Sequence, residues 1–260
     1  MLDNFTPVIH RFDNRDIKIY VVGDIHVGAP GFNVKAWSDF HARLQAEPDS
    51  FIVLCGDLMD NALKTSVSDS YEAVIRPRDQ KDWLIGQLRP IKDKILGIVP
   101  GNHEKRTKKS TDSEPVYDIC RVLGIEDRYR DISCCMILRF GERQGGGRGT
   151  SCYTIWMQHG AGGGKWTGSG VTRNEQFGYA FDGVDLLVTG HTHKVATAVP
   201  EKIVVDPRNG KVTMREFQPV IAGSWQQYGG YALDAQMMPS ASRIPEIHLK
   251  GTEKVFRVMV

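Results

Sequence analysis

The 260-residue sequence has few cysteines, little net charge and no long hydrophobic run, and each shortage excludes a class of protein. No segment approaches the ~20 apolar residues that a membrane helix needs, and the N-terminal residues lack the charged-then-apolar order of a secretory signal. The five cysteines form no C-x-x-C pair, so neither a disulfide framework nor a thiolate metal site is indicated. We therefore expect a cytoplasmic protein that binds no membrane.

The net charge of +2 is small for a dedicated nucleic-acid-binding protein, so any site for a polyanion must be a local patch. Hydrophobic residues make up 41% of the chain, enough to bury one substantial core. No internal repeat or long linker interrupts the sequence. We expect residues 1–260 to form a single domain, with a strand-rich part from about residue 194.

Short apolar segments alternate with helical patterns over most of the chain. The apolar segments stop abruptly at glycine or polar residues, as buried strands do, and they cover residues 17–24, 50–57, 94–103, 151–160 and 184–193. Helical periodicity predicts helices over residues 33–48, 78–93 and 114–125. The first of these carries an apolar face of Val34, Trp37, Phe40 and Leu44. Strands alternating with helices predict a layered α/β fold.

Two regions depart from this alternation. Residues 134–158 predict a β-hairpin with a glycine-rich tip at 141–150. After His193, short β-type segments joined by turns predict a second, more antiparallel sheet near the C-terminus.

Each of the five predicted strands ends in side chains that can bind metal: Asp24 and His26, Asp57, Asn102 and His103, His159, and His191 and His193. One such motif alone is more often a turn or a helix cap. Five in succession are hard to explain by turn chemistry, which does not call for histidine at four strand ends. The carboxyl ends of neighbouring strands in an α/β sheet border one crevice, so these side chains can converge there.

The mixture of carboxylate, imidazole and amide ligands suits two divalent ions, Mn²⁺ first, with Fe, Zn²⁺ or Ni²⁺ as alternatives. Two ions about 3.5 to 4 Å apart need a bridging ligand, and the Asp57 carboxylate is positioned for that role.

In order, Asp24-x-His26, Gly56-Asp57, Gly101-Asn102-His103-Glu104, His159 and Gly190-His191-x-His193 resemble the signature of the calcineurin-like metallophosphoesterases. The resemblance extends over residues 17–193. Within this family, the sequence is most similar to the compact, stand-alone members that are common in bacteriophage and prophage genomes. It implies an α/β fold in which two mixed sheets, flanked by helices, form a four-layer α-β-β-α sandwich.

The resemblance also implies roles for individual residues. One metal would be held by Asp24, His26, Asp57 and His193, and the other by Asp57, Asn102, His159 and His191. A metal-bridged hydroxide would attack the phosphorus atom. His103 would contact the phosphate or protonate the leaving oxygen, and Asp60 would orient His103.

The substrate is less specified than the metal site. The segment GDLMDN lacks the arginine of the protein phosphatases, and with the Gly-His-x-His ending this favours a phosphodiester in DNA, RNA or a nucleotide. Candidate substrate contacts are Lys105, Arg106, Lys165, Trp166 and Arg78. Three alternatives stay open for the function: a phosphomonoesterase, a cyclic-nucleotide phosphodiesterase and a non-catalytic binding module. Equally, residues 105–109 can be a solvated basic loop, and residues 160–170 a surface loop with a packed tryptophan.

Overall fold

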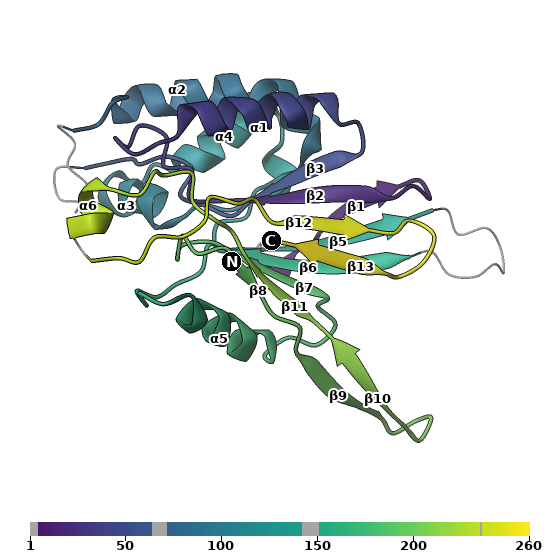
Figure 1. Cartoon of the computed structure of the whole chain (residues 1–260). Helices are drawn as coiled ribbons and strands as arrows, with labels where there is room; N and C mark the ends of the chain where they lie inside the picture. The colour runs from purple at the N-terminus through teal and green to yellow at the C-terminus, as the bar shows by residue number, and fades with distance from the viewer. Residues whose placement is uncertain (1–4, 64–71, 142–150, 235) are drawn as a thin grey trace.

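The computed structural model describes residues 5–63, 72–141, 151–234 and 236–260, and two β-sheets lie face to face between helices (Figure 1). The first sheet contains, in spatial order, β1 (Val8–Phe12), β5 (Ser133–Phe140), β6 (Cys152–Gln158), β7 (Leu186–Thr189), β11 (Gln218–Ile221) and β8 (Ala196–Thr197). The second contains β13 (Phe256–Met259), β12 (Glu246–Leu249), β2 (Ile17–Val22), β3 (Ser50–Leu54) and β4 (Ile95–Ile98). Both sheets mix parallel and antiparallel pairs.

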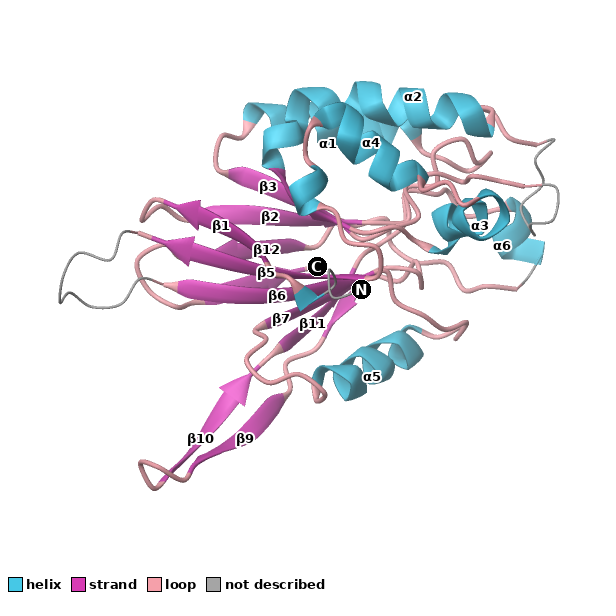
Figure 2. Ribbon diagram, turned by 180° about the vertical axis from the view of Figure 1, so that it is seen from behind, coloured by secondary structure: helices cyan, strands magenta, loops and turns pink. Residues whose placement is uncertain are grey.

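Helices cover the outer faces of the two sheets (Figures 1 and 2). On the second sheet lie α1 (Val34–Ala46), α2 (Pro77–Leu88) and α4 (Pro115–Leu123), and on the first lies α5 (Thr167–Gly178). Two further helices, α3 (Asn102–Thr111) and α6 (Gly230–Asp234), stand at the end of the sandwich. The chain therefore has the four-layer α-β-β-α architecture that the sequence predicts.

The central strand β2 shows why the apolar segments are continuous rather than alternating. Ile19 and Val21 pack into the core between the two sheets, whereas Tyr20 and Val22 pack under the helices. Since both faces of the strand are buried from Ile19 to Val22, each of these four positions carries a hydrophobic residue. The same double burial explains the apolar runs of β3 and β4.

The predicted helices are confirmed with small changes at their ends. Trp37, Phe40 and Leu44 of α1 are buried, but Val34 is 49% exposed because it occupies the first turn, next to the capping side chain of Asn33. The helical segment predicted over 78–93 divides into α2 and a 3₁₀ helix, η2 (Arg89–Lys94). Proline at the second position of η2 interrupts the α-helical hydrogen bonding.

The predicted second antiparallel sheet near the C-terminus is wrong. Strands β8 and β11 extend the first sheet, and β12 and β13 extend the second through β2. Among the described residues, β9 (Glu201–Asp206) and β10 (Lys211–Glu216) alone form a separate sheet, which has two strands. The open edges of β7 and β2 offer unpaired backbone groups, so the later strands complete existing sheets instead of forming a new one.

Three other features bear on the predictions. The 134–158 hairpin is confirmed as the antiparallel pair β5–β6, whereas its tip beyond Gly141 lies outside the described residues. Residues 64–71, which precede the candidate substrate contact Arg78, lie outside them as well. Across the described part of the chain, no helix combines the length and the apolar character needed to cross a membrane.

Candidate metal centre

The seven predicted metal ligands lie at the carboxyl ends of five strands from both sheets. Asp24 and His26 follow β2, Asp57 follows β3, and Asn102 follows β4 as the first residue of α3; His159 follows β6, and His191 and His193 follow β7. Backbone hydrogen bonds join the loops, from Asp24 N to Gly56 O at 3.0 Å and from Gly190 N to His159 O at 2.8 Å. The His191 N–H donates to Asp24 Oδ2 at 2.8 Å and so links the two sheets.

The backbone of this region is strained. Asp24, His26, Asp57, His191 and His193 all have φ angles between 49° and 70°, the left-handed region that residues with a Cβ rarely adopt. Each such residue costs on the order of 1–3 kcal/mol, and strain of this kind clusters at functional sites. Gly101 is required by close packing, because a Cβ there would lie 2.1 Å from Asp57 Oδ1.

One group of ligand atoms comes from Asp24, His26 and His193. Nε2 of His26 lies 3.1 Å from Nε2 of His193, which lies 3.4 Å from Asp24 Oδ1. Asp24 and His26 are buried, whereas the side chain of His193 is 38% exposed. Nδ1 of His26 is buried and has no hydrogen-bond partner among the described residues.

The second group comes from Asp57, Asn102, His159 and His191. Nδ1 of His159 donates to the carbonyl oxygen of Cys55 at 2.8 Å, so Nε2 of a neutral His159 carries a lone pair. That atom lies 3.2 Å from Asp57 Oδ2, 3.0 Å from Asn102 Oδ1 and 3.2 Å from His191 Nδ1. Converging lone pairs repel one another unless a proton or a cation lies between them.

Asp57 lies between the two groups. Its Oδ2 lies 3.2 Å from Nε2 of His159 and 3.9 Å from Nε2 of His26. Burial opposes ionisation of this carboxyl, but the charge and hydrogen bond of His159, together with the charges of His26 and His103, outweigh burial and hold the pKa of Asp57 well below its usual value. Burial likewise lowers the pKa of His159, but Asp57 outweighs it and raises the pKa to about 9. Two divalent cations fit this set, since they would replace the protons and satisfy the lone pairs.

His103 lies beside the two groups. Its backbone N–H donates to Asp57 Oδ1 at 2.8 Å, and its ring packs edge-on against His26 with centroids 4.4 Å apart. Nδ1 donates to the backbone carbonyl of Asp60 at 2.6 Å, and the Asp60 carboxylate is farther away, at 3.5 Å. Asp60 therefore contacts the ring with its carbonyl and its carboxylate, and Nε2 is left facing the ligands, 3.8 Å from Asp57 Oδ2.

The surroundings of His103 shift the pKa of its imidazole upward. Burial lowers the pKa of the imidazole, but the hydrogen bond with Asp60 and the charge of Asp57 together raise it above its usual value. Since Nδ1 must carry a proton to donate to a carbonyl oxygen, the contact of 3.4 Å with Arg106 Nη1 is not a hydrogen bond in this state.

Glu104 has a role that the sequence reasoning missed. Its buried carboxylate accepts three backbone hydrogen bonds, from Gly101 N at 2.8 Å, Met59 N at 2.8 Å and Asp57 N at 3.2 Å. It thereby joins the loop that carries Asp57 to the first turn of α3. The signal in the sequence is an acid three residues after a helix-capping position, the spacing of a capping box.

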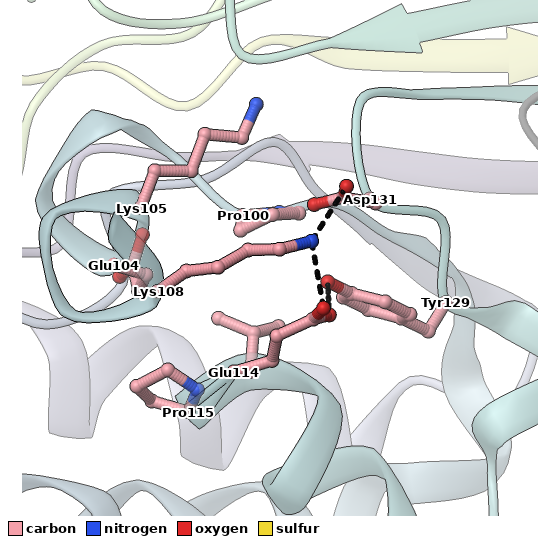
Figure 3. A pocket seen from close by; sticks show the side chains of 9 residues that line it. Pro100, Glu104, Lys105, Lys108, Glu114, Pro115, Tyr129 and Asp131 are labelled. Atoms are coloured by element: carbon pink, nitrogen blue, oxygen red, sulfur yellow. Dashed lines mark hydrogen bonds and ion pairs between the residues drawn. The ribbon is translucent and has the colours of Figure 1, made fainter. Parts of the chain in front are cut away.

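The basic stretch after Asn102 is helical, so its interpretation as a loop is wrong. Lys105 and Arg106 belong to α3, and Arg106 reaches the edge of His103. Lys108 binds Glu114 at 2.7 Å and Asp131 at 2.9 Å, whereas Lys105 points away from these acids (Figure 3). The charge of Lys108 is therefore neutralised by Glu114 and Asp131.

The remaining substrate candidates lie on exposed segments. Trp166 precedes α5 and is 71% exposed, so the alternative of a packed tryptophan is wrong. Lys165 is exposed beside it. Arg78 is exposed near the start of α2 and lies 3.7 Å from Asp79. Within the described residues, no hydrogen bond or ion pair joins Lys165, Trp166 or Arg78 to the seven candidate ligands.

All seven candidate ligands lie in the part of the chain that matches a known protein family. A family model described as calcineurin-like phosphoesterase matches residues 17–195. A predicted phosphoesterase from Streptococcus pneumoniae, described as a conserved uncharacterized protein, is a similar solved structure, with 11% identity, a TM-score of 0.39 and coverage of 94% of this chain and 89% of that one. A metallophosphoesterase from Sphaerobacter thermophilus shows 12% identity, a TM-score of 0.41 and the same coverages. No curated protein matches the sequence.

Proposed function

The chain belongs to the calcineurin-like phosphoesterase family, and we propose that it is a dinuclear metal-dependent phosphoesterase that hydrolyses phosphodiester bonds in nucleic acid or a nucleotide. One observation carries the proposal: ligand atoms converge in two adjacent groups, and Oδ2 of Asp57 lies within 3.9 Å of a histidine nitrogen of each group. The donor set of carboxylate, imidazole and amide oxygen favours Mn²⁺, with Fe, Zn²⁺ or Ni²⁺ as alternatives.

Residues of the chain perform the remaining chemistry around the ions. When bound, two divalent ions supply a water of lowered pKa and a positive charge that holds phosphoryl oxygens. Asp24 and Asp57 are the two carboxylates among the seven ligands, so they neutralise only part of this charge and an anionic ester is attracted. The N-terminus of α3 also faces the ligands and adds a partial positive charge.

His103 is the proposed general acid. Because Nδ1 is held by Asp60, the ring is oriented with Nε2 toward the ligand cluster, where it can transfer its proton to the leaving oxygen. An in-line reaction places that oxygen opposite the attacking one. Asp60 is a positioning residue, since it acts through His103.

Side chains around the ligand cluster support the proposed preference for a diester substrate. Arg106 and Lys105 give α3 a positive surface next to His103, and neither forms an ion pair with an acid in the described residues. Exposed Trp166 offers a ring on which a base can stack, a contact that any nucleotide can make. His193 is partly exposed, so the cluster is open to solvent on that side.

The proposal is tested by Mn²⁺-dependent hydrolysis of bis-p-nitrophenyl phosphate and p-nitrophenyl phosphate side by side. We expect the diester to be preferred and His103→Ala to be inactive, with His248→Ala, a change in β12, as the matched control. Preference for the monoester would refute the phosphodiesterase assignment. Failure of Mn²⁺ and the other three metals to support hydrolysis of either ester would refute the phosphoesterase assignment.

A further inference from the structure

The hairpin formed by β9 and β10 projects from the sandwich (Figures 1 and 2). Its two strands pair in register from Glu201 with Glu216 to Asp206 with Lys211, and they pair with no other strand in the described structure. An isolated two-stranded ribbon is marginally stable in water. A projecting ribbon of this kind therefore calls for a contact that stabilises it.

The root of the hairpin is anchored to the end of α5. The Lys202 ammonium donates to the carbonyl oxygens of Gly178, at 2.7 Å, and Phe181. It also lies over the rings of Phe217 and Tyr179, 4.9 Å and 5.7 Å from their centroids. These contacts fix the direction in which the rest of the hairpin projects.

One face of the hairpin is apolar and exposed. Ile203 lies opposite Met214, and Val205 lies opposite Val212, so alternation places all four side chains on one face. They are between 57% and 70% exposed. Contiguous apolar patches of several hundred Å² on a protein surface mark interaction sites, whereas single exposed apolar residues do not.

Charges of opposite sign lie at the two ends of the hairpin, with two glutamates of the apolar face at its root and Arg208 in the turn at its tip. At the root, Glu201 lies directly opposite Glu216, and like charges in this position are destabilising. Neither carboxylate forms an ion pair within the described part of the chain. At the tip, the exposed side chain of Arg208 also lacks an acidic partner there, since Asp206 bonds to Asn209 and to backbone N–H groups.

We propose that this face binds the same face of a second copy of the chain, with the two hairpins antiparallel about a two-fold axis. In this arrangement the apolar pairs of the two copies pack together, and Arg208 reaches the partner's Glu201 and the partner's Glu216. The contact is self-complementary, as a two-fold interface must be, because each hairpin is acidic at its root and basic at its tip.

The size of the surface is consistent with a weak to moderate dimer. A specific interface buries at least about 1,000 Å² in total, or roughly 500 Å² from each partner. The four apolar side chains, each more than half exposed, form the apolar part of this area. A polyanionic substrate would not select an apolar face, so the hairpin is a surface for protein rather than for nucleic acid.

The test is the molar mass of the full-length chain by sedimentation velocity and light scattering over a hundredfold range of concentration. We expect a concentration-dependent dimer. Val205→Lys places a charge in the apolar face and should raise the dimer Kd at least about tenfold. Thr213→Lys is the matched control, since it makes the same charge change on the opposite face of the hairpin and should leave the dimer intact.

Charge reversal tests the antiparallel arrangement. Arg208→Glu should weaken the dimer, and combining it with Glu201→Lys and Glu216→Lys should restore it. Hydrolysis per chain, which does not involve these residues, should be unchanged in every variant and so reports correct folding.

A wild-type chain that is monomeric throughout the range would overturn the proposal, whether or not it binds phosphatidylcholine vesicles through this face. A dimer that Val205→Lys and Thr213→Lys affect equally would overturn it too. Failure of the triple variant to restore the dimer would refute the antiparallel pairing.

Discussion

The role of Glu104 predicts a large effect from a small change, Glu104→Gln. The substitution keeps the size of the side chain but replaces one acceptor oxygen with an amino group. With its oxygen at the position of Oε2, glutamine retains the bonds from Gly101 N and Asp57 N, and its amino group faces the N–H of Met59. The N–H of Met59 then faces another hydrogen-bond donor and has no acceptor.

The loss of stability in Glu104→Gln follows from these contacts. A buried backbone donor left without an acceptor costs about 1–3 kcal/mol, and the two retained hydrogen bonds lose the strength that an ionised acceptor gives them. Relief of repulsion offsets part of this loss: burial and the neighbouring Asp57 carboxylate both raise the pKa of Glu104. We expect a net loss of about 2–3 kcal/mol, or about 5–10 °C in Tm for a chain of this size.

The same change should weaken metal binding, because Glu104 positions the loop of Asp57 against Asn102. Loss of a residue that orients metal ligands lowers affinity by about 10–100-fold. Calorimetric titration with Mn²⁺ and thermal unfolding measure the two effects. Glu114→Gln is the matched control, since the Glu114 carboxylate is partly exposed and its partners among the described residues are Tyr129 and Lys108. Unchanged Tm and Mn²⁺ affinity in Glu104→Gln would refute the reasoning.

Three further predictions concern the proposed reaction. His103→Ala should lower kcat by about 10²–10⁴-fold with metal content unchanged, and loss of metal along with activity would contradict its role as acid. Activity should fall as pH rises through the raised pKa of His103, since the general acid must be protonated. Asp60→Asn removes an interaction that raises this pKa, so the fall in activity should move to lower pH. An unmoved pH profile would exclude Asp60 as a positioning residue. Arg106→Ala should raise KM for the diester more than it lowers kcat, whereas Arg121→Ala on α4 should change neither; equal effects would remove Arg106 from the substrate site.

Much of the fold was predictable because the central strands are buried on both faces. Strands such as β2 and β3 give continuous apolar runs, and α1 and α4 have apolar faces and recognisable ends. The helices α3 and α5 were not predictable in this way. Helix α3 has a single buried residue, Glu104, and α5 contains glycines in its first turn, so tertiary contacts rather than periodicity determine both.

The pairing of the strands could not be predicted from the sequence either. β12 pairs with β2 although more than 200 residues separate them in the chain. The residues of β12 do not indicate with which strand it pairs. The predicted antiparallel sheet therefore had the right strands but the wrong neighbours. A hydrophobic pattern determines which face of a strand is buried and leaves open the edge to which it adds.

The composition of the candidate site could be predicted because ligand-type side chains follow successive strands. The structure brings all seven together, although their binding of metal stays a prediction. The left-handed backbone at Asp24 and Asp57, and the buried carboxylate of Glu104, could not be foreseen, because both depend on how the loops pack against one another. Substrate contacts were the least predictable, since long exposed side chains such as Arg78 leave few constraints on where they act.

The number of Mn²⁺ ions bound per chain, measured by elemental analysis after dialysis for the wild type and Asp57→Asn, tests the central claim most directly. If Asp57 is shared between two metal sites, the wild type binds two ions and the variant, which loses a ligand of each site, binds fewer than one. A wild type that binds a single ion, or a variant that retains two, would contradict the dinuclear site.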